Sequence, residues 1–242
     1  MKSGEIRTPR TMPESLIRRP IQSLPANWLP ERTGTMRGMS RLDPSTMRRA
    51  SPPVALAKGA SVSVVEVTRG ASAWSYVQAS ALNRRVTPNT PTAFSGPARG
   101  NRQLRTLHSP DGTQGRGTIN NCANGPMPWG TYATAEENWA GYFRRDTGDA
   151  TVRTNAGAAK ENRSLTRYGI GEGRAGNYGW STVAASDPSN TSFRRWNATA
   201  SAALAADGTG DFRHEPFQFG WIVEIDPYDP ASTPRKRTAL GR

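Results

Sequence analysis

The 242-residue chain has a single cysteine, Cys122, and two histidines. One cysteine excludes an intrachain disulfide. No apolar run approaches the roughly 20 residues that a helix needs to cross a bilayer, so no membrane span is expected. Arg18-Arg19 resembles the start of an export signal, but Pro20 follows and no apolar segment comes after it. The sequence therefore shows no recognisable signal peptide.

Three common catalytic signatures are also missing. The chain contains no Gly-x-Ser-x-Gly, no phosphate-binding Walker loop and no His-Glu-x-x-His. His108 and His214 have no sequence neighbour that would complete a helical metal pair or a catalytic triad. These absences argue against a serine hydrolase and against a zinc protease.

Lysine is scarce, although the formal net charge is +13. Only Lys2, Lys58, Lys160 and Lys236 are lysines among 32 basic residues, and the others are arginines. Arginine suits bidentate phosphate contacts, but a solvated basic surface or compositional drift explains the bias equally well. The basic residues are spread along the chain without a nucleic-acid motif, so a nucleic-acid partner is not expected and is kept only as a distant alternative.

The composition favours strands and turns over helices. Hydrophobic residues make up only 35%, while Gly (24 residues) and Pro (19 residues), which helix interiors tolerate poorly, are frequent. Short β-branched and aromatic runs separated by Gly and Pro predict an all-β fold with long irregular loops. The predicted strands are residues 61–67, with 74–77 as a hairpin partner, then 117–121, 129–137 and 219–226. Residues 198–206 are the one short helix expected in the polar, Gly/Ala-rich stretch 144–213.

The two ends of the chain differ in character. Residues 1–55 are rich in Pro, Arg, Met and Ser without sustained periodicity, which predicts an irregular or disordered segment. Residues 56–242 carry the predicted strands and form the expected folded domain. Residues 233–242 resemble the start of a further strand, so we expect the chain to be part of a larger fold.

The densest group of chemically capable residues surrounds Cys122. An isolated cysteine is most often an inert buried residue, but here Asn, Gly and Pro surround it in a tight loop, where a thiolate would be a strong ligand for iron or zinc. Glu136 and Glu137 follow, and in a strand they point to opposite faces. Glu137 shares its face with Ala133 and Ala135, which leave room for a cation, so it is the better ligand candidate.

Glu224 is the third candidate ligand. In the predicted strand 219–226 it lies opposite the face of Trp221, Val223 and Ile225. An ordinary outward-facing carboxylate is the alternative. Asp226 shares its face but precedes Pro227, where it could cap a turn, and Glu215 remains possible in the preceding loop.

These residues fall within a longer pattern that resembles PhoX-type alkaline phosphatases. Its centre reads Asn-Asn-Cys-Ala-Asn-Gly, then Pro-Trp-Gly-Thr, Glu-Glu-Asn and Gly-Tyr-Phe, over residues 120–143. Matching stretches before this centre are residues 62–67, 83–85 and 95–100, and those after it are residues 178–180, 194–199, 219–227 and 236–242. The resemblance covers about residues 50–242, and the first 50 residues match poorly.

The resemblance implies a six-bladed β-propeller that holds iron and calcium at its centre and hydrolyses phosphomonoesters. It implies that Cys122 is an iron ligand and that Glu137 is a metal ligand, with Glu224 as the best match for a further carboxylate ligand. Members of the family are usually exported by the twin-arginine route and continue well beyond the position of Arg242, where further ligands are expected. We therefore expect this chain to be an incomplete propeller with an incomplete active site, and a non-catalytic remnant or binding protein of the same fold is the alternative.

Overall fold

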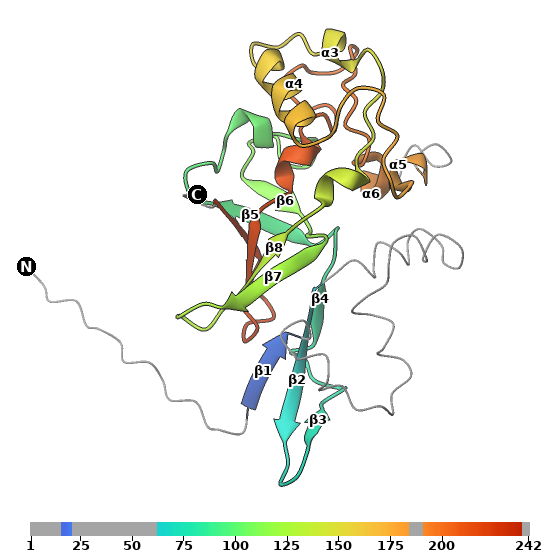
Figure 1. Cartoon of the computed structure of the whole chain (residues 1–242). Helices are drawn as coiled ribbons and strands as arrows, with labels where there is room; N and C mark the ends of the chain where they lie inside the picture. Colours follow the sequence, from blue (N-terminus) through green and yellow to red (C-terminus); the bar gives the residue numbers. More distant parts are fainter. Residues whose placement is uncertain (1–15, 21–61, 184–190, 239–242) are drawn as a thin grey trace, which may run out of the picture.

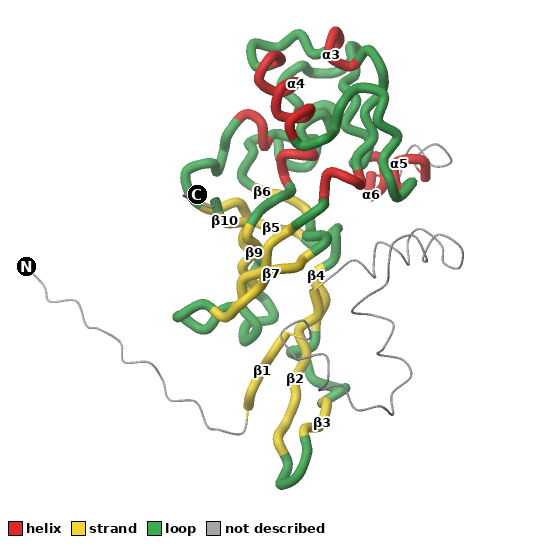
Figure 2. The backbone as a smooth tube through the Cα atoms, in the orientation of Figure 1, coloured by secondary structure: helices red, strands yellow, loops and turns green. Residues whose placement is uncertain are grey.

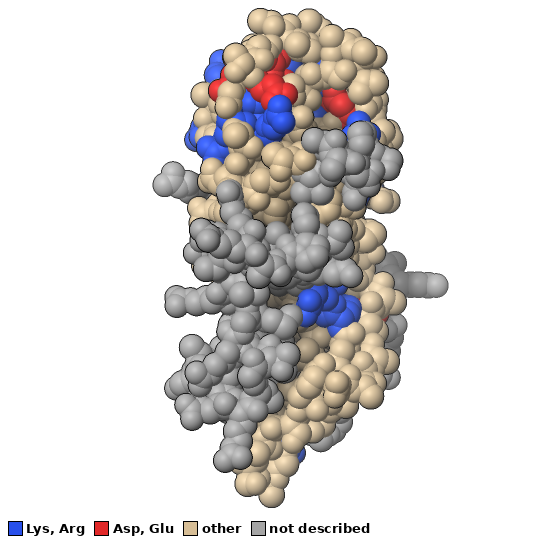
Figure 3. Space-filling view, turned by 90° about the vertical axis from the view of Figure 1, so that its right-hand side faces the viewer, with Lys and Arg blue, Asp and Glu red and all other residues tan. Residues whose placement is uncertain are grey.

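The computed structural model describes residues 16–20, 62–183 and 191–238. Two β-sheets fill the middle and one end of the molecule, and the short helices gather at the other end, beyond the larger sheet (Figures 1 and 2). On the face drawn in Figure 3, the visible acidic side chains lie beside basic ones at this helical end. Among the described residues, no helix has the length and apolar character needed to cross a membrane.

The smaller sheet is built around one long strand, β2 (Val62–Arg69). Strand β1 (Leu16–Pro20) pairs with it antiparallel on one edge. Strands β3 (Trp74–Tyr76) and β4 (Arg84–Val86) pair with its two ends, at residues 67–69 and 62–64. The pairing of β2 with β3 confirms the predicted hairpin between residues 61–67 and 74–77.

The larger sheet has six strands in the order β6-β5-β10-β9-β8-β7. Their bounds are β5 Pro91–Ser95, β6 Gln114–Arg116, β7 Asn121–Pro126, β8 Tyr132–Glu136, β9 Ile222–Ile225 and β10 Arg235–Arg237. The pairing of β10 with β5 is parallel and the others are antiparallel. Strand β10 confirms that residues after 233 form a strand, and strand β7, which contains Cys122, lies at the edge of the sheet.

Two apolar clusters hold these layers together. Residues of the smaller sheet pack against β8 and β9 of the larger one; the buried members are Val62, Val64, Val86, Tyr132, Val223 and Ile225. A second, aromatic cluster lies beneath the helices, and it contains Ile119, Trp139, Tyr142, Phe143, Leu165, Ile170, Trp180, Phe193, Trp196, Ala198 and Phe219. The smaller cluster joins the two sheets, and the aromatic cluster joins the helical end to Ile119 and Phe219, which lie just before β7 and β9.

The helices are short and mostly absent from the sequence-based prediction. They are α3 Asp149–Val152, α4 Ala158–Arg167, α5 Trp180–Val183 and α6 Thr191–Arg194, with 3-10 turns η3 Arg102–Leu104, η4 Trp139–Tyr142 and η5 Glu215–Gln218. The buried face of α4 consists of Glu161 and Leu165, four residues apart. Because one of these is charged, the usual apolar repeat of an amphipathic helix is hidden in the sequence.

Two predicted elements are wrong in placement or type. Residues 117–121 do not form one strand, because Gly117 has φ +72° and a Cβ there would lie 1.8 Å from the carbonyl oxygen of Pro88. Residues 198–206 form turns rather than a helix. The N–H groups of Ala200 and Ser201 donate to Asp149 and Asp211 side chains instead of to helical carbonyls.

The all-β prediction holds at the coarse level of a mostly stranded fold with few helices. The described residues form two open sheets, and a closed propeller is not seen in this part of the chain. Within the segment predicted to be irregular, residues 1–55, the described strand β1 is ordered by its pairing with β2. The other residues of that segment lie outside the described ranges, so the boundary near residue 55 remains a prediction.

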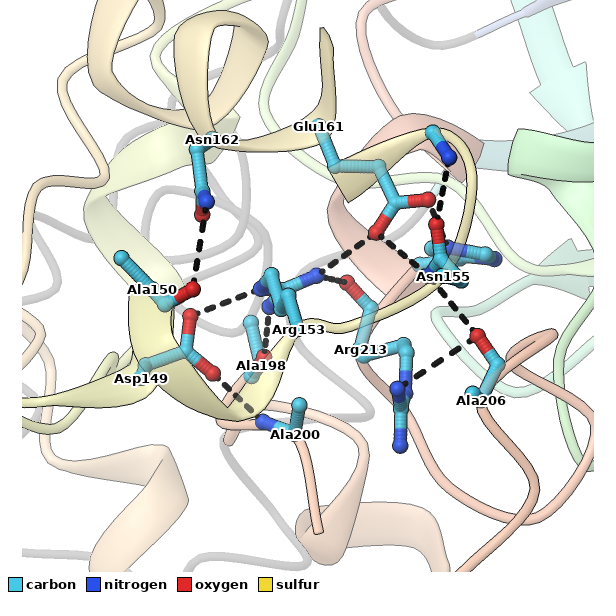
Figure 4. A network of polar contacts seen from close by, with 12 residues as sticks. Asp149, Ala150, Arg153, Asn155, Glu161, Asn162, Ala198, Ala200, Ala206 and Arg213 are labelled. Carbon is cyan, nitrogen blue, oxygen red and sulfur yellow. Dashed lines mark hydrogen bonds and ion pairs between the residues drawn. The ribbon is translucent and has the colours of Figure 1, made fainter. Parts of the chain in front are cut away.

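A buried polar network ties α3 and α4 to the loops around residues 198–213 (Figure 4). The Asp149 carboxylate accepts hydrogen bonds from Arg145 Nε (2.5 Å), Arg153 Nε (2.7 Å) and the Ala200 N–H (2.6 Å). Glu161 lies 3.4 Å from Arg153 Nη1 and 3.1 Å from His214 Nε2. His214, which has no partner in sequence, therefore has one in space, and both residues are fully buried.

This network predicts a loss of stability in acid. Burial alone would raise the pKa of Glu161, but its contacts with His214, Asn155 and Arg153 outweigh burial and lower the pKa from 4.5 to about 2. A carboxyl whose pKa is lower in the folded state stabilises the fold above its unfolded pKa, and that contribution disappears as the pH falls from about 4.5 to about 2. We expect on the order of 3 kcal/mol to be lost across this window.

Thermal melts of the wild type and of Glu161→Gln between pH 6 and pH 2 measure this effect. The variant lacks the titrating carboxyl, so its melting temperature should change less over the window. Parallel pH curves for the two proteins would contradict the assignment to Glu161.

Candidate functional site

Cys122 lies on an irregular part of the edge strand β7. The register between β7 and β8 shifts between Asn121 and Asn124, so Cys122 and Ala123 occupy a bulge. The Cys122 side chain is exposed and forms no disulfide. Bulges redirect side chains near functional sites, and this one presents the thiol to solvent at the edge of the sheet.

Glu137 lies directly beside this bulge. Its N–H donates to the carbonyl oxygen of Asn120 (3.0 Å), which brings the end of β8 against the start of β7. A hydrogen bond to the Glu137 side chain, together with the carboxylate charge, raises the pKa of the Cys122 thiol. The structure thus brings two of the three predicted ligands together, and a thiol and a carboxylate form one exposed corner.

The backbone of this corner adopts unusual conformations. Among the described residues other than glycine, positive φ angles occur at Asn120 (51°) and Asn138 (48°), which flank the thiol and the carboxylate. Left-handed conformations are costly for most side chains, and asparagine tolerates them better than most. The two asparagines of the Asn-Asn-Cys and Glu-Glu-Asn runs therefore have a structural role in shaping the corner.

Glu224 lies apart from the corner and is already held by protein groups. Its Oε1 accepts hydrogen bonds from Trp129 Nε1 (2.6 Å) and Thr131 Oγ1 (2.5 Å), and Arg237 pairs with Oε2. Burial would raise the pKa of Glu224, but the contacts with Arg237, Thr131 and Trp129 outweigh it and lower the pKa. All three partners favour the carboxylate form of Glu224.

The sheet register explains the separation. Glu224 is paired with Ala133 of β8, and Glu137 comes four residues later along the same strand direction. At about 3.3 Å per residue, the two positions are roughly 13 Å apart on the same face. Within the described ranges, no three His, Cys, Asp or Glu side chains are arranged to hold a metal ion together.

The other acidic candidates have structural partners. Asp226 accepts the N–H groups of Tyr228 (2.8 Å) and Asp229 (3.3 Å), so it caps the turn after β9 as the sequence suggested. Glu215 is buried at the start of η5 and pairs with the buried Arg195. Glu136 is buried within the larger sheet, on the face opposite Glu137.

A cavity of about 440 Å³ opens between α4, η3, η5 and the end of β10. Aromatic side chains form much of its wall, with two cations among them; the residues that define it are Trp139, Tyr168, Phe217, Trp221, Lys160 and Arg237. Its volume falls in the range of small-molecule sites. No local pattern in the sequence predicts this cavity, because its wall is assembled from segments that include residues 98–104 and 217–238, more than 100 residues apart.

The chain matches a family model and a solved structure. The family model described as Alkaline phosphatase PhoX matches residues 32–242. A solved structure of Pseudomonas fluorescens PhoX in complex with vanadate, a transition-state analogue, is 36% identical to the chain with a TM-score of 0.55. The match covers 75% of this chain and 26% of that one, so the chain spans about a quarter of the length of this relative. A search of curated proteins gave no match.

The family match contains every residue of the corner and both sheets apart from β1, since it begins at residue 32. It agrees with the resemblance carried by the Asn-Asn-Cys and Glu-Glu-Asn runs. This chain belongs to the PhoX alkaline phosphatase family.

Proposed function

We propose that the protein is a metal-dependent phosphomonoester hydrolase of the PhoX type. The observation that carries this proposal is the exposed corner of Cys122 and Glu137, formed by the sequence runs that mark the family. The complex of the Pseudomonas fluorescens relative with a transition-state analogue supports phosphoryl chemistry as the expected reaction.

The donor set of the corner fits iron. A thiolate is a soft ligand that favours iron over calcium, and a neighbouring carboxylate suits either ion. A side-chain hydrogen bond with Glu137 and the negative charge of its carboxylate raise the pKa of the Cys122 thiol, so a thiolate and a carboxylate in this corner would repel each other. A cation bound between them would remove this repulsion, so we propose Cys122 and Glu137 as iron ligands.

Glu224 fits the proposed metal centre only if it changes partners. We retain it as a proposed ligand for calcium or iron, but it would have to exchange the guanidinium of Arg237 for the cation. Calcium alone takes six to eight oxygen ligands, more than the three proposed side chains supply. We therefore propose that these residues provide only part of the centre, within a larger, six-bladed propeller.

When bound, such cations would hold the phosphate group and offset the charge that develops on it during transfer. The chain's own contribution is to fix the thiolate and carboxylate on neighbouring strands. The bulge in β7 points the thiol outward, and the N–H of Glu137 bonded to Asn120 keeps the carboxylate beside it.

A non-catalytic remnant or binding protein of the same fold is the second candidate. The separation of Glu224 from the corner favours it, because the three proposed ligands do not meet in the described residues. Such a protein would retain a metal at the corner without turning over phosphomonoesters.

The test combines metal analysis with an activity assay. We expect the protein expressed from its complete reading frame to retain iron and calcium in a fixed ratio after dialysis. It should hydrolyse a chromogenic phosphomonoester in a manner that chelators and vanadate inhibit. Turnover by the 242-residue chain itself should be near background, because the three proposed ligands do not meet in the residues that the structure describes.

The outcomes separate the two candidates. Bound metal without turnover in the complete protein would favour the non-catalytic alternative. Neither metal nor turnover, in a protein with a cooperative melt, would contradict both.

A further inference from the structure

Glu136, the last residue of β8, and Glu137, which follows it, have opposite surroundings. Glu137 is exposed beside Cys122, whereas Glu136 is buried, with 7% of its surface exposed. Consecutive strand residues point to opposite faces, so one carboxylate faces solvent and the next faces the protein interior. Only Glu137 is needed as a ligand in the proposed function, which leaves the buried Glu136 without an assigned role.

Glu136 connects three segments that are far apart in sequence. Its Oε2 accepts the N–H groups of Gly220 (2.9 Å) and Trp221 (3.1 Å), and its Oε1 accepts a hydrogen bond from Lys236 Nζ (2.9 Å). Its own N–H donates to the carbonyl oxygen of Trp221 (3.1 Å). Backbone and side chain together therefore fasten the end of β8 to the start of β9.

Lys236 is the cationic half of this arrangement and is fully buried in β10. Besides Glu136, its ammonium group donates to the carbonyl oxygen of Gln218 (2.5 Å) and lies 4.3 Å from the centre of the Phe219 ring. A buried ammonium group is costly without partners, and these three contacts compensate for that cost. The pair thus spans β8, η5 and β10 inside the sheet.

We propose that the buried Glu136–Lys236 ion pair positions the Cys122–Glu137 corner. Glu136 is bonded to Glu137 through one peptide bond and is paired across the sheet with Asn121, which precedes Cys122. Fixing Glu136 therefore fixes the backbone on which the thiol and the carboxylate stand. The two adjacent glutamates then have different roles: Glu136 holds the end of β8 in place, and Glu137 is available to bind a metal ion.

This inference rests on the proposed function in one respect, namely that Cys122 and Glu137 bind a metal. The contacts of Glu136 and Lys236 do not involve a metal and do not depend on that proposal. A general stabilising role for the pair is the competing explanation. A variant of a buried, ion-paired glutamate in another part of the fold can separate the positioning role from a general stabilising role. Glu161 is also buried and ion-paired, but it lies in α4, and its ion-pair partners Arg102, Arg153 and His214 lie outside β7 and β8.

The experiment compares Glu136→Gln with Glu161→Gln in the same purified chain. Hydrogen exchange followed by mass spectrometry reports on the amides of residues 120–138. Cobalt(II), used as a probe, reports on the corner through its thiolate absorption band. We expect Glu136→Gln to lose protection in residues 120–138 and to bind cobalt about tenfold more weakly, as is typical when a residue that orients a ligand is removed.

Glu161→Gln should lower the melting temperature by a similar amount, yet leave the exchange of residues 120–138 and the cobalt affinity unchanged. Equal effects of both variants at the corner would overturn the positioning role. Unchanged exchange and cobalt affinity in Glu136→Gln would overturn it as well.

If Glu136→Gln does not fold, Lys236→Met tests the same claim, because it leaves the bonds from Gly220 and Trp221 to Glu136 in place. A wild-type chain that shows no cobalt–thiolate band would contradict the proposed function. In that case the exchange of residues 120–138 still decides whether the ion pair orders the corner.

Discussion

Replacing Cys122 with serine should abolish iron binding by the chain while leaving the fold intact. Cys122 carries the one thiol in the sequence, and serine is a far poorer ligand for iron than a thiolate. The side chain is exposed on an edge strand and belongs to neither apolar cluster, so little packing is lost. Iron content after dialysis, together with thermal melts of both proteins, measures the two effects. The phosphatase activity that we propose should be lost as well.

Met127→Leu is the matched control for this substitution. Met127 lies in the loop between β7 and β8, five residues after Cys122, and contributes no strong metal ligand. It should bind iron as the wild type does. Unchanged iron content in Cys122→Ser would refute the assignment of Cys122 as a ligand.

Asp149→Asn should destabilise the protein by about 3–5 kcal/mol, the cost typical of breaking a buried ion pair. Asp149 is 1% exposed and accepts hydrogen bonds from Arg145, Arg153 and the Ala200 N–H. Removal of its charge leaves two buried guanidinium groups short of a counter-charge. Denaturant-induced unfolding measures the free energy of unfolding. A lower midpoint denaturant concentration with an unchanged m-value would show that the substitution lowers the stability of the native state.

Asp146→Asn provides the control, at a position in the loop that leads into α3. Asp146 pairs with Arg144 at 2.6 Å, but both side chains are about 40% exposed. Exposed ion pairs contribute about 0–1 kcal/mol, so this variant should unfold close to the wild type. If the two variants unfolded at the same denaturant concentration, the buried network would not have the stabilising role that its geometry indicates.

Two strands could be predicted from local patterns. Residues 61–67 are rich in β-branched side chains and contain most of β2, and the apolar residues of 219–226 alternate and contain β9. Strands β1 and β4 were not predicted, because each is short and is defined by its pairing with β2. The helical end could not be predicted in the same way. Glu161 and the charged groups around it satisfy one another in the interior, so the buried side of α4 does not read as apolar.

The candidate site was accessible to sequence reasoning only in part. The alternation rule for strands separates Glu137 from Glu136, and the structure places them on the exposed and buried sides accordingly. The proximity of Cys122 to Glu137 followed from the family resemblance and not from spacing. The position of Glu224 depends on the register between β8 and β9, and no local pattern in the sequence encodes that register.

The roles of Glu136 and Lys236 were hidden for a similar reason. Their contacts cross 100 residues of sequence, and an adjacent pair of glutamates is ordinarily read as a solvated surface. The signal that could have raised the question is the scarcity of lysine. In a chain with four lysines, Lys236 lies between two arginines in a strand, where the alternation of faces turns it inward.

X-ray absorption spectroscopy of the purified chain loaded with iron tests directly whether Cys122 binds the metal. We expect a sulfur scatterer together with oxygen ligands around the iron, and we expect the sulfur contribution to disappear in Cys122→Ser. An iron environment made of oxygen and nitrogen alone in the wild type, identical in the two proteins, would contradict it.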